Sequence, residues 1–206
     1  MKICLDPGHG GKDTGASFRD LNEKDITLDI CLACFERLQL FHWTILTRSS
    51  DLCVSLTNRV QIANWWHADL FVSIHCNADP DIDELWMPEA HGEEIWIYPG
   101  SLTGRHVAEA IQSHVDSFFK EHRFRGIKES GNFYVLRETQ MPAVLIETGF
   151  IDNVNEHGAF QGTASRRRIG LTLGRGLLEY DKGIISPTNG GRMNSGPALN
   201  GGRCNN

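Results

Sequence analysis

Three residues that could bind a metal or move a proton each follow a short apolar segment. They are His9 after residues 3–5, His75 after residues 70–74, and Glu147 after residues 143–146. Each apolar segment is typical of a short buried strand. The first segment leads into glycines that flank His9, so its imidazole has little bulk around it. A tight turn with an incidental histidine would explain His9 alone, but three such residues after three strands indicate a common site.

The chemistry of these side chains points to a metal hydrolase. Because the carboxyl ends of parallel strands share one edge of a sheet, we expect His9, His75 and Glu147 at that edge. Glu23 begins the first expected helix, after a loop that leaves the same edge, so it can fold back towards them. Two imidazoles and one carboxylate are a common ligand set for hydrolytic zinc, and the second carboxylate would then be free to act as a base. Spacing alone does not prove this, because the H-E-x-x-H helix signature is absent.

The elements that must position these residues alternate between strand and helix. Strands are expected at residues 3–5, 43–46, 70–74, 94–98, 133–137 and 143–146, and helices at 24–40, 56–66, 102–119 and 165–180. The polar, glycine-containing residues 12–22 indicate a loop, and residues 79–92 an acidic loop. This alternation predicts an α/β fold, with a mostly parallel twisted sheet of about six strands and helices on both faces.

Length and composition indicate a single globular domain. The chain has 206 residues, of which 40% are hydrophobic and 22% charged, enough to bury a sizeable core. From residue 183 onward Gly, Asn, Ser and Pro dominate, so we expect a domain at residues 1–182 and a flexible tail or linker stub at residues 183–206. The pair Cys31 and Cys34 lies inside a helical pattern without a second pair, which favours small buried residues over zinc ligands.

Charge and hydropathy limit the classes of partner and the location. The formal net charge of −6 argues against a nucleic-acid partner, because phosphates are held mainly by clustered Lys and Arg. No apolar run approaches the roughly 18 residues that a membrane span needs. The N-terminus leads directly into the first strand, which predicts synthesis in the cytoplasm without a signal peptide.

Five blocks of sequence carry the candidate residues and their neighbours. They are residues 6–15 (DPGHGGKDTG), 23–25 (EKD), 70–78 (LFVSIHCNA), 133–137 (FYVLR) and 141–151 (MPAVLIETGFI). Together these blocks resemble the zinc-dependent N-acetylmuramoyl-L-alanine amidases of the third amidase family. The resemblance covers residues 2 to about 180 in the family's order. One small departure is Cys76, where alanine is usual, and a small apolar neighbour of a ligand leaves the site intact.

The resemblance implies a reaction and a role for each candidate residue. His9, Glu23 and His75 would bind one zinc ion per chain, and Glu147 would be the catalytic carboxylate. The substrate would be peptidoglycan, in which a zinc-activated water hydrolyses the amide bond between N-acetylmuramic acid and L-alanine. Asn77 and Arg137 are weaker candidates, for contacts with substrate amides and with a stem-peptide carboxylate. Each is equally explained as an ordinary turn residue or strand end.

Other interpretations remain open at this point. The site chemistry also permits a zinc hydrolase of another amide or ester, such as a deacetylase or a carboxypeptidase. An inactive wall-binding homologue is disfavoured because all four functional positions are filled. An amidase made without a leader resembles a bacteriophage endolysin, which reaches the wall after phage-mediated release, and the alternative is a bacterial autolysin. The sequence leaves the host, the oligomeric state and a missing C-terminal wall-binding domain undecided.

Overall fold

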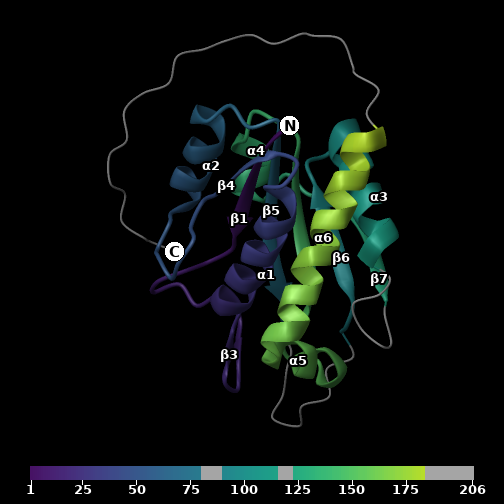
Figure 1. Ribbon diagram of the computed structural model, residues 1–206. Coiled ribbons are helices and arrows are strands. Elements are labelled where there is room, and N and C mark those ends of the chain that lie inside the picture. Colours follow the sequence, from purple (N-terminus) through teal and green to yellow (C-terminus); the bar gives the residue numbers. More distant parts are fainter. Residues whose placement is uncertain (80–89, 116–122, 184–206) are drawn as a thin grey trace.

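A computed structural model describes residues 1–79, 90–115 and 123–183 (Figure 1). Within these ranges, six strands form one sheet in the order β4-β1-β5-β8-β6-β7. The strands of this sheet are β1 (Lys2–Pro7), β4 (Trp43–Leu46), β5 (Leu70–Asn77), β6 (Glu93–Ile97), β7 (Phe124–Glu129) and β8 (Ala143–Phe150). Neighbouring strands are parallel except for β6 and β8, which pair antiparallel. The predicted α/β class and mostly parallel six-stranded sheet are therefore confirmed.

Helices cover both faces of the sheet, also as predicted. They are α1 (Glu23–Leu38), α2 (Leu56–Trp65), α3 (Leu102–Val115), α4 (Tyr134–Glu138), α5 (Val154–Gln161) and α6 (Thr163–Gly183). Helix α6 lies between α1 and α3 on one face (Figure 1), and residues of α2 and α4 pack on the other. Strand β1 shows the alternation that serves two cores, because Ile3 and Leu5 join the first core and Cys4 the second.

Helix α6 approaches both of its neighbours closely because glycines face them. A Cβ atom on Gly170 would lie 2.7 Å from the Cβ of Ala33 in α1. A Cβ on Gly176 would lie 2.8 Å from the Cα of Ile111 in α3. Since the side chains at a contact set the distance between two helices, these glycines let α6 close the first core tightly. Cys31 and Cys34 are free, buried thiols in α1, as the helical pattern predicted.

Residues 133–137 were predicted as a strand, and this is wrong. Phe133 precedes helix α4, and its carbonyl oxygen accepts hydrogen bonds from the amides of Leu136 and Arg137. Strand β8 already has β5 and β6 as partners, so it offers this segment no free edge and the backbone bonds close locally. Val135 and Leu136 are buried in the second core. Packing therefore overrides the strand preference of an aromatic and β-branched segment.

The sixth strand is instead β7, which the hydrophobic pattern did not reveal. Its pairing with β6 shifts in register, since Glu93 pairs with Phe124 but Ile95 pairs with Ile127. The extra residue lies beside Gly126, whose φ of +109° suits a bulge. Phe124 and Ile127 both pack against the first core, although they are three residues apart. Because of this bulge, the sequence of β7 lacks the regular alternation of buried and exposed residues that predicts a strand.

Other short elements occupy segments without a strong sequence signal. Strands β2 (Ser17–Phe18) and β3 (Leu21–Asn22) form a hairpin inside the predicted loop at 12–22, and helix α5 was not predicted. Most of the predicted acidic loop and residues 116–119 of the predicted third helix lie outside the described residues. The tail from 184 onward does too, so the domain boundary stays a prediction. No helix in the described part combines the length and apolar character that a membrane span requires.

Candidate metal centre and active site

The candidate residues lie together at the carboxyl ends of three adjacent strands. Strands β1, β5 and β8 are neighbours in the sheet, and His9 stands two residues beyond the end of β1. His75 and Glu147 are partners across β5 and β8. Both lie inside their strands rather than beyond them, because β5 and β8 extend to Asn77 and Phe150. The two side chains therefore project from the same face of the sheet.

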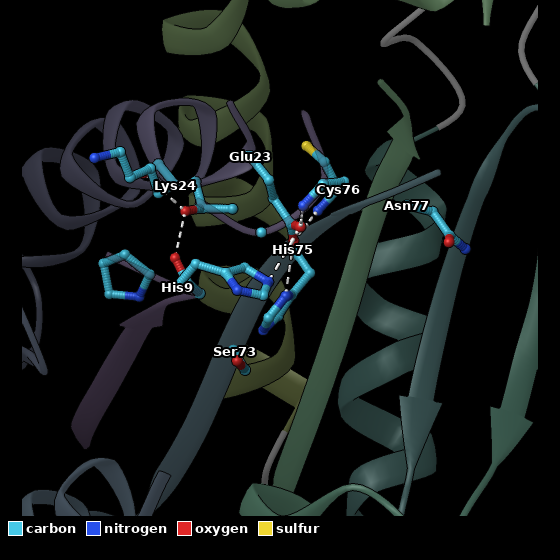
Figure 2. A network of polar contacts seen from close by, with 12 residues as sticks. His9, Glu23, Lys24, Ser73, His75, Cys76 and Asn77 are labelled. Carbon is cyan, nitrogen blue, oxygen red and sulfur yellow. Dashed lines mark hydrogen bonds and ion pairs between the residues drawn. The ribbon is translucent and has the colours of Figure 1, made fainter. Parts of the chain in front are cut away.

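The carboxylate of Glu23 lies next to the imidazoles of His9 and His75, so that three possible metal ligands converge (Figure 2). Its Oε2 is 3.1 Å from His9 Nε2, and its Oε1 is 2.8 Å from His75 Nδ1. The two rings lie edge to face, with centroids 5.0 Å apart. One possible ligand atom from each residue falls within 4.8 Å of the others. Two imidazoles and a carboxylate at this separation fit a zinc ion, whose ligand atoms lie about 2.0–2.2 Å from the metal.

The carboxylate of Glu23 is fixed by the backbone on both sides. The amide of Ala16 donates to Oε2 at 2.9 Å, and the amide of Cys76 donates to Oε1 at 3.0 Å. Glu23 is also the first residue of α1, where the helix dipole favours a negative charge. The short β2–β3 hairpin brings the start of α1 back to the sheet edge. Glu23 is buried, and these contacts orient its carboxylate.

Asp13 orients the ring of His9. Its Oδ2 lies 2.9 Å from His9 Nδ1, and because a carboxylate accepts, this nitrogen carries the proton in the neutral ring. The lone pair is then on Nε2, the nitrogen that faces Glu23. Such a carboxylate behind a ligating histidine is a common way of fixing the tautomer at a metal site. Asp13 was not predicted to act at the site, although an acid four residues after a candidate ligand was a usable signal.

Burial and charge shift the proton affinities of these groups. Burial alone would lower the pKa of His75, but the hydrogen bond to Glu23 and its negative charge outweigh this and raise the pKa to about 9. Burial raises the pKa of Glu23, yet the hydrogen bond from His75 and the nearby imidazole of His9 lower it well below the usual range. Both shifts therefore favour a positive charge beside the buried carboxylate of Glu23.

Glu147 lies beside this cluster and remains free of its hydrogen bonds. Burial raises the pKa of Glu147 to about 7; the charge of His75 opposes the shift, and those of Glu23 and Glu94 add to it. Its buried Oε2 has no hydrogen-bond partner among the described residues. A carboxylate that binds protons near neutrality and has a free oxygen is suited to act as a general base.

A cavity of about 720 Å³ opens over His75 and Glu147. Its walls are residues 53–59 at the start of α2 and residues 132–135 at the start of α4. A volume of this size suits a small-molecule or peptide segment. These walls could not be predicted from the sequence, because they become neighbours only when α2 and α4 pack on the same face of the sheet.

The two weaker candidates lie outside this cavity lining. The Oδ1 of Asn77 accepts a hydrogen bond from the amide of Ala78. Figure 2 shows this side chain apart from those of His9, Glu23 and His75. Arg137 is in α4, where it bonds Glu138 and the carbonyl oxygen of Gly131. It lines a different hollow near the start of α3. Their roles in substrate binding stay predictions.

Gly8 leaves the space that the ring of His75 occupies, so we predict that Gly8→Ala weakens metal binding. A Cβ at this position would lie 2.7 Å from His75 Nδ1, which forces the ring or the turn to move. We expect zinc affinity to fall about tenfold, as is typical when the support of a ligand is disturbed. Gly158→Ala is the matched control, because nothing lies within 4 Å of a Cβ there. Competition with a zinc-binding dye measures both, and equal affinities for the two variants would contradict the prediction.

Comparison with known proteins reveals similarity over nearly all of the described chain. Residues 3–179 match the family model for N-acetylmuramoyl-L-alanine amidases. The chain is 42% identical over 185 residues to the N-acetylmuramoyl-L-alanine amidase CwlM of Bacillus licheniformis, which covers 86% of this chain and 67% of that protein. It is 38% identical over 160 residues to the endolysin of Bacillus phage SPP1, covering 75% of this chain and 56% of the endolysin.

A solved structure supports the same grouping. The N-acetylmuramoyl-L-alanine amidase AmiC2 of Nostoc punctiforme superposes with a TM-score of 0.80 at 32% identity, covering 88% of this chain and 97% of that one. The chain spans little more than half the length of the phage relative and two thirds of the Bacillus licheniformis relative. The similarity therefore covers part of these two relatives rather than their whole length.

Proposed function

The chain belongs to the N-acetylmuramoyl-L-alanine amidase family, and from this premise we propose that it hydrolyses one amide bond of peptidoglycan. The bond joins the lactyl carbonyl of N-acetylmuramic acid to the L-alanine that begins the stem peptide. We propose that His9, Glu23 and His75 hold one zinc ion per chain and that Glu147 is the catalytic base. The action is at the bacterial cell wall.

One observation carries this proposal: His9, His75 and Glu147 line one cavity at an edge of the sheet, and Glu23 contacts both histidines. Three ligand atoms come within 4.8 Å of one another, and His75 and Glu147 both line the cavity. A substrate carbonyl in that cavity would lie next to the cation and the base at once. Proximity of this kind supplies much of the advantage that an enzyme has over water.

A zinc ion bound here would supply a water of lowered pKa, about 7 in place of 15.7, and would polarise the substrate carbonyl. The residues of the chain do the rest. Glu147 takes a proton from the attacking water as its oxygen bonds to the carbonyl carbon. When the carbon–nitrogen bond breaks, Glu147 passes that proton to the nitrogen of the departing L-alanine. His9, Glu23 and His75 stay in place throughout, because Asp13 and the amides of Ala16 and Cys76 hold two of them.

Two kinds of relative leave two biological settings for the same reaction. The endolysin of a Bacillus phage and an amidase of Bacillus licheniformis are both similar to this chain. In the first setting the enzyme would reach the wall after phage-mediated release, and in the second it would act on the wall of the cell that makes it. The endolysin-like setting stays a prediction, and the bond that is cleaved is the same in both.

Digestion of purified cell walls tests the proposal. We expect new free N-terminal L-alanine and intact stem peptides, identified by mass, without new reducing sugar. A deacetylase would instead release acetate, and a carboxypeptidase would shorten the stem peptide from its far end. Walls that are bound but chemically unchanged would indicate an inactive wall-binding protein. Any of these three results would overturn the proposed bond.

A further inference from the structure

A buried arginine of helix α2, Arg59, donates hydrogen bonds to the turn that carries His9. The guanidinium of Arg59 donates from Nη1 to the carbonyl oxygen of Pro7 and from Nη2 to that of His9, both at 2.6 Å. Its Nε donates to the carbonyl oxygen of Val54 at 3.0 Å. Only 3% of Arg59 is exposed. One side chain therefore connects the wall of the cavity to the backbone on both sides of the turn.

Arg59 is itself anchored by a buried acid on strand β1. Its Nη1 lies 2.6 Å from Asp6 Oδ1, while the hydroxyls of Thr47 and Ser73 donate to the same carboxylate. Burial raises the pKa of Asp6, but the charge of Arg59 and these hydrogen bonds outweigh it and lower the pKa below its usual value. Every guanidinium nitrogen of Arg59 and both carboxylate oxygens of Asp6 therefore have a hydrogen-bond partner, which orients the two side chains.

The backbone of the turn needs such support. His9 has a φ of +59°, a left-handed conformation that is uncommon for a residue other than glycine. A strained residue of this kind persists when the surrounding structure determines it. Arg48 also supports the backbone of the turn, since it donates hydrogen bonds to the carbonyl oxygens of Pro7 and Gly8. Of these two arginines, it is Arg59 that bonds the carbonyl oxygen of His9 itself.

We propose that Arg59 is a positioning residue, which holds the His9 turn so that the imidazole faces Glu23 and His75. This inference rests on the proposed metal site, and it assigns Arg59 no contact with substrate. Because the guanidinium presents several donors in one plane, it bonds Asp6, Pro7 and His9 together. The single ammonium group of lysine is a point charge that lacks this planar fork. Lysine would therefore keep the charge beside Asp6 and lose the hold on the turn.

Arg59→Lys tests the proposal in two ways. We expect zinc affinity, measured by dye competition, to fall about 10- to 100-fold, the usual effect of losing a partner behind a metal ligand. In the metal-free protein we expect faster hydrogen exchange at the amides of residues 10–13. The amides of Gly10 and Asp13 bond each other's carbonyl oxygens within this turn. Wild-type affinity and wild-type exchange in Arg59→Lys would overturn the proposal.

Arg166→Lys is the matched control, because Arg166 is also buried and also bonds a carbonyl oxygen and an acid. Its partners are Phe160 and Asp29, away from the His9 turn. We expect this variant to lose thermal stability while zinc affinity and exchange at residues 10–13 stay unchanged. If both variants lost zinc affinity in proportion to their loss of stability, the effect of Arg59 would be global and the proposal would fail.

A double variant keeps the test decisive if Arg59→Lys does not fold. Asp6→Asn combined with Arg59→Gln removes both charges, so neither is left buried without a partner. We expect it to fold and to show the same loss of zinc affinity and the same faster exchange, and wild-type behaviour would count against Arg59. If the wild-type chain itself bound no zinc, the proposed metal would be wrong. The exchange comparison would still decide whether Arg59 holds the turn.

Discussion

Glu147→Gln is expected to retain zinc and to lower the rate of wall hydrolysis by about 10²–10⁴-fold. Glutamine keeps the shape of the side chain but cannot accept the proton of the attacking water. The expected loss corresponds to about 3–6 kcal/mol in the barrier. Glu147 is not among the three converging ligands, so the metal should remain. Loss of turbidity of purified walls gives the rate, and atomic emission gives the zinc content.

A second buried carboxylate provides the control for this prediction. Glu156 accepts hydrogen bonds from the amides of Gly92 and Phe150, and burial raises its pKa as it does that of Glu147. It does not line the cavity. Glu156→Gln should therefore cost stability rather than turnover per folded molecule. If Glu147→Gln cleared walls at the wild-type rate, the assignment of Glu147 as the base would be wrong.

The sequence was sufficient to predict that the candidate residues lie close together wherever the signal was local. His9, His75 and Glu147 each follow a short apolar segment, and the pairing of parallel strands then fixes their common edge. The approach of Glu23 to both histidines depends on a hairpin of two very short strands. A hairpin of this length leaves no periodic pattern, so the expected fold-back could be stated but its distances could not.

The remaining features depend on contacts between distant segments. Residues 133–137 have strand propensity, and only the occupied edges of β8 explain why they form α4. Strand β7 was missed because one extra residue beside Gly126 breaks its period. The support from Arg59 joins residues about fifty positions apart. Neither propensity nor spacing reports on such pairs, because the energy that decides them comes from packing and burial in the folded chain.

His75→Ala is expected to lose the metal and, with it, more turnover than Glu147→Gln. Removing one of three protein ligands leaves His9 and Glu23 alone, and zinc sites that catalyse hydrolysis usually have three. The variant should contain little zinc after dialysis. Added zinc at 100 times the wild-type dissociation constant should stabilise the wild-type chain by about 2.7 kcal/mol and leave His75→Ala unchanged. Thermal unfolding with and without zinc measures the difference.

Chelation of the metal and substitution of a second buried histidine provide two controls for His75→Ala. Treatment of the wild-type chain with a chelator should reproduce the inactivity of His75→Ala, and added zinc should restore only the wild type. His42 is also buried, but it lies beside the N-terminus and Asp181, far along β1 from the cluster. His42→Ala should therefore keep its zinc and its response to added metal. A His75→Ala variant that still held one zinc per chain would exclude His75 from the metal site. Because His75 is the cross-strand partner of Glu147, the proposal that the metal lies next to the catalytic base would then fail as well.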